Sequence, residues 1–191
     1  MASLLLSGCT ALTISNLPVI GSEGGQVQLD SQYFADAVIA GQFEHCVYRY
    51  DTANNFTVLM YDGSIDKPAR AVVISSFWRP TAAKTPIDSN STNATLQYYA
   101  FTEAQDGSPQ VGVYSGAGFV YLSATPGADK IKASIWQATV RLEDRSADYD
   151  DTLGEANMTG KVIALRDNTA MPQLLHSLDA EVTRRLGYPR L

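Results

Sequence analysis

The sequence predicts an α+β fold that is mainly antiparallel β, a curled sheet or sandwich of about seven to eight strands with a short N-terminal helix and a C-terminal amphipathic helix. Short runs rich in Val, Ile and aromatic residues follow one another along most of the chain, and Gly, Pro, Asn and Asp separate them. These gaps are too short for the crossover helices that a parallel sheet requires. Near the C-terminus the apolar residues change to helical spacing.

A short N-terminal helix is predicted over residues 32–41. Asp30 and Ser31 stand directly before it, and both are residue types that cap helix N-termini. One apolar face then follows at helical spacing, and its last member, a glycine, is also a stop signal. The residues on this face are Phe34, Ala37, Val38 and Gly41.

The strands are predicted from β-branched and aromatic runs between turn signals. Pro80 ends the third run, because proline cannot donate to a sheet ladder. The segment Ser115-Gly116-Ala117-Gly118 is interpreted as a turn between two short strands. The predicted strands cover residues 45–50, 56–61, 70–78, 94–102, 110–115, 118–123, 130–142 and 160–165.

The C-terminal helix is predicted to pack one apolar face on the sheet. Asn168 or Thr169 is the expected cap, Pro172 suits the first turn, and Gly187 with Pro189 ends the helix. The apolar face consists of Leu174, Leu175, Leu178, Val182 and Leu186.

Composition limits the classes of function. The chain has 191 residues, with 14 Lys and Arg against 20 Asp and Glu, so the formal net charge is −6. We therefore expect no nucleic-acid partner, because phosphate binding needs clustered basic residues. Two cysteines exclude a disulfide framework, and no Cys/His cluster indicates structural zinc. Residues 29–191 are predicted to form a single β-rich globular domain.

The segment Leu6-Ser7-Gly8-Cys9 resembles the lipobox of bacterial lipoproteins, a Leu and two small residues before a Cys. The resemblance implies that residues 1–8 are a truncated signal segment and that the Cys9 thiol carries the lipid. It also implies a flexible tether over 9–28, a lipid bilayer as partner, and a place in the bacterial envelope, at the outer membrane facing the periplasm. Two alternatives remain open: an apolar N-terminal strand that buries Cys9, and an arm packed along the domain.

We predict no catalytic residue and no cofactor, so an enzyme is the less favoured interpretation. The chain has two histidines, His45 and His176, to act as bases for a nucleophile. Ser115 lacks the G-x-S-x-G spacing of a nucleophile elbow. Cys46 directly follows His45 in a predicted strand, so the two side chains point to opposite faces. A buried thiol is the preferred interpretation of Cys46.

The acidic segment 144–155 is a weak metal candidate. Its oxygen ligands for a hard cation such as Ca²⁺ would be Asp148, Asp150, Asp151 and Glu155. Their spacing does not match an EF-hand, so we expect an exposed, mobile connector without a tightly held ion.

The preferred function is that of a non-enzymatic envelope lipoprotein, an accessory or scaffold subunit of a larger membrane-associated assembly that binds other envelope proteins. Ten tyrosines agree with an interaction role, because tyrosine is favoured in protein interfaces. The alternatives are a hydrolase or carbohydrate-active domain that uses dispersed Asp and Glu, and a viral or secreted structural subunit.

Overall fold

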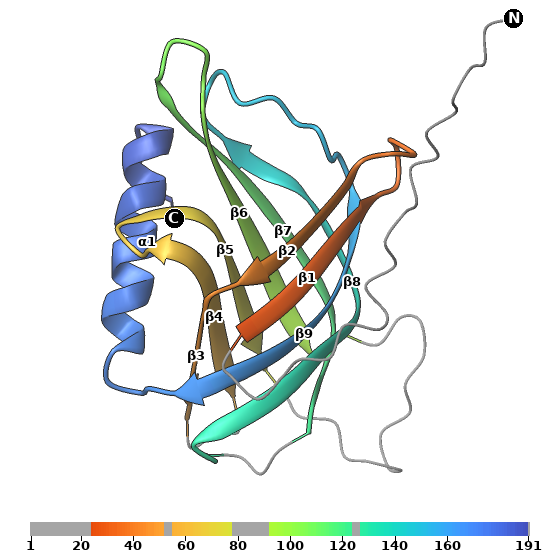
Figure 1. Cartoon of the computed structure of the whole chain (residues 1–191), viewed down its shortest axis with the longest axis vertical. Helices are drawn as coiled ribbons and strands as arrows, with labels where there is room; N and C mark the ends of the chain where they lie inside the picture. The colour runs from red at the N-terminus through yellow and green to blue at the C-terminus, as the bar shows by residue number, and fades with distance from the viewer. Residues whose placement is uncertain (1–23, 52–54, 78–91, 124–126, 191) are drawn as a thin grey trace, which may run out of the picture.

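The computed structural model describes residues 24–51, 55–77, 92–123 and 127–190 (Figure 1). Over these residues the chain forms nine strands and one helix. The strands are β1 (Gly24–Ser31), β2 (Val38–Phe43), β3 (His45–Tyr50), β4 (Phe56–Ser64), β5 (Lys67–Ser76), β6 (Ala94–Glu103), β7 (Pro109–Leu122), β8 (Lys130–Arg145) and β9 (Ala156–Arg166). The helix α1 spans Met171–Leu186.

The strands form one sheet that closes into a barrel (Figure 1). Their order is β2-β1-β9-β3-β4-β5-β6-β7-β8, and a further pairing of β8 with β9 closes the ring of β3 to β9. All pairs are antiparallel except β3 with β9, which is parallel. The expected antiparallel β domain is confirmed, but it is a closed barrel and not an open curled sheet or a sandwich.

The hairpin of β1 and β2 is added to the barrel beside β3. β1 pairs with residues 156–163 of β9, whereas β3 pairs with the same strand further on, at Leu165 and Arg166. Two strands thus share one edge of β9, and β2 becomes the outermost strand. Residues 24–28, which the sequence places in the tether, lie in β1.

The predicted helix over 32–41 is not present, because a turn leads directly into β2. Ser31 does act as a cap, since its Oγ accepts hydrogen bonds from the backbone N–H groups of Tyr33 and Phe34 at 3.1 and 3.0 Å. Only one turn follows, and the chain then pairs with β1. Pairing along a whole strand outweighs a helical spacing that local propensity supports only weakly.

The predicted turn at Ser115-Gly116-Ala117-Gly118 is wrong, because β7 continues through it. The two glycines are needed for a close approach of β8. A Cβ on Gly116 would lie 1.8 Å from the carbonyl oxygen of Thr139, and one on Gly118 would lie 2.4 Å from that of Gln137. Glycine within a strand here indicates contact between backbones and not a chain reversal.

Side chains fill the inside of the barrel. Successive residues of a strand point to opposite faces, so one alternate set from each strand meets at the barrel axis. Large side chains that are less than 2% exposed include Tyr48, Met60, Ile74, Leu96, Tyr114 and Met158. The interior is therefore a packed core over most of its length.

Helix α1 lies against the outside of the barrel (Figure 1). Leu178, Val182 and Leu186 are buried there, with Leu174 and Leu175 partly buried, as the predicted apolar face requires. Their partners on the outer faces of β4 to β7 include Leu59, Val73, Tyr99 and Val113. In the part of the chain that the structure describes, no helix is both long and apolar enough to cross a membrane.

The helix ends differ in how well the sequence predicts them. Gly187 ends α1 in the left-handed conformation, with φ of 83°, and Pro172 lies in the first turn, both as expected. Neither predicted cap is used. Asp167 Oδ1 instead accepts hydrogen bonds from the N–H groups of Thr169 and Ala170, at 3.1 and 2.8 Å. The amide of Asn168 bonds to the backbone of Tyr50.

Candidate functional site

A cavity of about 420 Å³ opens at one mouth of the barrel, the upper end in Figure 1. It lies between β2, β5 and β6 and the loop that joins β8 to β9. Its walls include Ile39, Ala69, Arg70, Tyr98, Ala100 and Tyr149. Ala100, on the inner face of β6, leaves room that larger side chains fill deeper in the barrel.

Tyr98 is the buried polar group of this cavity. Its side chain points inward from β6, because it alternates with Leu96 and Ala100 along the inner face. The residue is only 4% exposed, and its hydroxyl, which makes no hydrogen bond to another described residue, keeps some contact with the space of the cavity. Burial raises the pKa of Tyr98 to about 12, although nearby Arg70 opposes the rise. The phenol is therefore neutral at pH 7 and is able to donate or accept a hydrogen bond.

Arg70 of β5 connects the outermost strand, β2, to the barrel wall. Its Nε donates to Asp62 Oδ2 on β4, and its Nη2 donates to the carbonyl oxygen of Gln42 at 2.9 Å. The guanidinium also lies 5.1 Å from the centre of the Phe43 ring. Gly41 provides the space, since a Cβ there would lie 2.1 Å from Nη1 of Arg70. Side chains thus connect the barrel wall to the edge of β2 that pairs with no other strand.

The loop between β8 and β9 folds into the mouth as a plug. Tyr149 and Leu153 are buried in the barrel core. The Tyr114 hydroxyl donates to Asp151 Oδ1 at 2.7 Å and lies 3.2 Å from the Tyr149 hydroxyl. Gly112 makes room for this ring, because a Cβ there would lie 2.2 Å from Tyr149. The expectation of a wholly exposed, mobile connector is therefore corrected.

The plug is held by neutral phenols and one carboxylate. Asp151 Oδ1 also accepts hydrogen bonds from the backbone N–H groups of Leu153 and Gly154, at 3.1 and 2.9 Å. Burial, followed by the hydrogen bonds to Tyr149 and Asp151, raises the pKa of Tyr114. Burial likewise raises the pKa of Tyr149. Both rings therefore stay neutral beside the carboxylate.

The four acidic residues of the weak metal candidate serve different purposes. Asp148 and Asp150 are exposed, and Asp150 borders the mouth cavity. Asp151 is used by the plug, whereas Glu155 borders a separate groove on the outside of β7 and β8. Across the described residues, no three His, Cys, Asp or Glu side chains are grouped so as to hold a metal ion.

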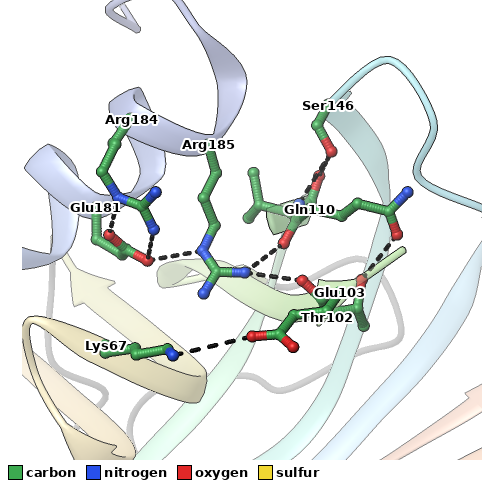
Figure 2. Close-up of polar contacts among 9 residues, drawn as sticks. Lys67, Thr102, Glu103, Gln110, Ser146, Glu181, Arg184 and Arg185 are labelled. Carbon is green, nitrogen blue, oxygen red and sulfur yellow. Dashed lines mark hydrogen bonds and ion pairs between the residues drawn. The ribbon is translucent and has the colours of Figure 1, made fainter. Parts of the chain in front are cut away.

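Beside the mouth, a buried ion pair fixes the ends of β6 and β7 (Figure 2). Arg185 of α1 donates from Nε to Glu181 Oε1 at 2.7 Å. Its Nη1 donates to the carbonyl oxygens of Thr102 and Gln110 at 2.8 and 2.9 Å. Both of these residues also line the cavity, so α1 positions one wall of the mouth. Burial raises the pKa of Glu181, but the hydrogen bonds from Arg184 and Arg185 outweigh this and lower it.

The other predicted residues are not brought to the mouth. Cys9 lies outside the described residues. His45 is exposed and stacks on Tyr61 with ring centres 4.7 Å apart, whereas Cys46 is buried inside the barrel, so the two point apart as expected. His176 is exposed on α1. The Ser115 hydroxyl is buried and has no hydrogen-bond partner among the described residues. Both histidines belong to other elements, His45 to β3 and His176 to α1.

Sequence reasoning missed the two residues that define the site, Tyr98 and Arg70. The one available signal for Tyr98 is that it directly precedes a second tyrosine, Tyr99, and tyrosine is common in strands. Comparison of the chain with protein-family models, curated proteins and solved structures finds no match. The interpretation of the site therefore depends on its own geometry and chemistry.

Proposed function

We propose that this protein is a non-enzymatic binding protein whose recognition site is the barrel mouth. The observation that carries the proposal is the Tyr98 hydroxyl, which belongs to a residue only 4% exposed, borders the cavity and makes no hydrogen bond to another described residue. A ligand that covers this hydroxyl displaces water from it and must replace the lost hydrogen bond. Ligands without a suitably placed polar atom are therefore bound less tightly, and this requirement gives selectivity.

Two features of the walls favour specific recognition. The Arg70 guanidinium is held by Asp62 and Gln42, so its remaining donors are oriented before a ligand arrives. The neighbouring part of the wall is fixed by Arg185 through Thr102 and Gln110 (Figure 2). A preorganised site loses little conformational entropy on binding.

Acid–base hydrolysis receives less support from the carboxyl groups. A catalytic acid needs a raised pKa in order to hold its proton near pH 7. Hydrogen bonds from Ser108 lower the pKa of Asp106, and the arginines of α1 lower that of Glu181. Neither residue lines the mouth cavity. The function that we propose for this site is binding, and it is based on Tyr98, Arg70 and the cavity walls.

A screen of small organic molecules by two-dimensional NMR tests the proposal. We expect bound compounds to shift the amide signals of Ala69, Tyr98 and Ala100, and Tyr98→Phe to weaken the binding of compounds that carry a polar atom. Tyr61→Phe is the matched control, since Tyr61 packs in the outer cluster beneath α1. Shifts confined to surfaces away from the mouth would contradict the proposal.

We also propose that the protein acts in the bacterial envelope, anchored through lipid on Cys9. The support is the lipobox-like segment alone. The intact mass of the protein from its native cells tests this, because acylation and removal of residues 1–8 change the mass in opposite directions. An unmodified Cys9 would exclude the anchor, and it would leave the mouth site unaffected.

A second candidate function is that of an accessory subunit that binds a partner protein through the β1–β2 turn. Tyr33, Phe34 and Val38 are 70%, 51% and 51% exposed. Exposed large apolar side chains gathered on one turn are typical of protein interfaces. Cross-linking in native cells from Tyr33, compared with cross-linking from exposed Asp148, tests this candidate. Equal yields from the two positions would exclude it.

A further inference from the structure

We propose that the mouth takes a neutral molecule with an aromatic body of one or two rings and a carbonyl oxygen. This inference rests on the proposed binding function and adds the chemical class of the ligand. It follows from three properties of the cavity, namely its free hydrogen-bond donors, its net charge and its apolar walls.

Arg70 and Tyr98 both line the cavity from neighbouring strands, so we assign their free donors to one ligand oxygen. Arg70 pairs with Ala100 across β5 and β6, and Tyr98 pairs with Val72, so the two are diagonal neighbours on the inner face. Such neighbours are about 7–8 Å apart, within reach of long and aromatic side chains. Arg70 Nη1 and the Tyr98 hydroxyl make no hydrogen bond within the described residues. A carbonyl oxygen has two lone pairs, so it is able to accept from both.

The charges at the mouth favour a neutral ligand over a carboxylate. Arg70 is already paired with Asp62, whose carboxylate balances its charge. Asp150 adds a second carboxylate to the rim. The plug adds one charge of each sign, Arg145 on the Tyr149 carbonyl oxygen and Asp151 on the Tyr114 hydroxyl. An anionic ligand would therefore enter a region with one excess negative charge, whereas a neutral acceptor gains the same two hydrogen bonds without that repulsion.

The remaining walls suit a flat apolar body. Ile39, Ala69 and Ala100 provide aliphatic surface, and the rings of Tyr98 and Tyr149 provide aromatic surface. A volume of about 420 Å³ falls within the range of roughly 300–1,000 Å³ for small-molecule sites. Aromatic rings prefer offset or edge-on contact with other rings, which these walls offer.

A matched series of three probes tests the inference: 2-acetylnaphthalene, naphthalene and 2-naphthoate, titrated by NMR against the full chain. The ketone is expected to bind at the mouth about tenfold more tightly than naphthalene, which lacks the acceptor oxygen. The carboxylate is expected to bind more weakly than the ketone. Tyr98→Phe should remove the advantage of the ketone and leave naphthalene unchanged, whereas Tyr61→Phe should change neither.

A separate variant tests the effect of negative charge at the mouth. Asp150→Asn is expected to raise the affinity for 2-naphthoate several-fold and to leave that for the ketone unchanged. Tightest binding of 2-naphthoate by the unaltered chain would overturn the neutral class while the mouth stays a binding site. If Tyr98→Phe leaves the affinity of the ketone for the mouth unchanged, the role of that hydroxyl is overturned. Failure of all three probes to shift mouth signals would overturn the inference, and the broader screen then decides the binding function separately.

Discussion

Glu181 and Arg185 form an ion pair of 2.7 Å beneath α1, and their side chains are only 6% and 3% exposed. Arg185 continues from this pair to two backbone carbonyl oxygens at the ends of β6 and β7, and it stacks 5.1 Å from the centre of the Phe101 ring. The helix is thus connected to the barrel mouth by charge as well as by its apolar face. Loss of this connection affects both stability and the cavity wall.

Arg185→Met is expected to destabilise the protein by about 3 kcal/mol. The substitution leaves the carbonyl oxygens of Thr102 and Gln110 without this donor and leaves the buried carboxylate of Glu181 with Arg184 alone, and breaking a buried pair is strongly unfavourable. Arg184→Met is the control, because Arg184 contacts the same carboxylate but its side chain is 54% exposed. It should cost less than about 1 kcal/mol. Urea denaturation measures both, and equal losses would contradict the assignment.

Gly116→Ala is expected to destabilise the barrel by at least 1–3 kcal/mol, the usual range for overpacking. The added Cβ would lie 1.8 Å from a backbone oxygen of β8, which is unable to move aside as a side chain would. Gly24→Ala is the control, since its nearest contact would be an ordinary 3.7 Å. Thermal unfolding of the two variants gives the comparison, and similar melting temperatures would show that β7 and β8 do not approach so closely.

Local patterns predicted most of the secondary structure. Residues 45–50 were delimited as β3 by strand-forming residues before a polar gap, and the helix face with Leu178 and Val182 is where the spacing placed it. Such patterns fail where one residue serves two purposes. Glycine is typical of turns, but at Gly116 it is required because β8 approaches closely. Likewise Ser31 caps a single turn before the chain enters β2.

Closure of the barrel and the mouth site depend on contacts between residues distant in the sequence. The residues around Val47 and Leu165 carry no sequence pattern that indicates their parallel pairing. Tyr98 resembles any inward-facing strand tyrosine, and only Ala69, Ala100 and the plug make its hydroxyl a cavity group. The sequence does not predict the plug, because its acidic residues indicate solvent exposure. In the structure the side chains of Tyr149 and Leu153 are nevertheless buried.

Alkaline pH is expected to destabilise the protein through Tyr98. Its pKa is about 12 in the folded chain against an ordinary 10.0, so the folded state holds the proton more tightly than the unfolded state. Stability is therefore complete below pH 10 and falls as pH rises towards 12, by roughly 2–3 kcal/mol in total. In Tyr98→Phe this slope should be shallower, because one tyrosine no longer titrates. Exposed Tyr33→Phe should leave it unchanged, and urea midpoints measured across this range give the slopes.

Asp151→Ala is expected to release the plug. The carboxylate accepts hydrogen bonds from the Tyr114 hydroxyl and from two backbone N–H groups. Its removal leaves the two N–H groups unpaired and leaves Tyr114 with the Tyr149 hydroxyl at 3.2 Å, and the expected loss of stability is about 1–3 kcal/mol. Amide hydrogen exchange over residues 146–155 should accelerate more than exchange in β4, because the loop opens locally before the barrel unfolds. Asp148→Ala, which removes an exposed carboxylate from the same loop, should change neither stability nor exchange. If both variants exchange alike, the carboxylate of Asp151 does not hold the plug, and the wall that Tyr149 gives to the cavity must be maintained by apolar packing alone.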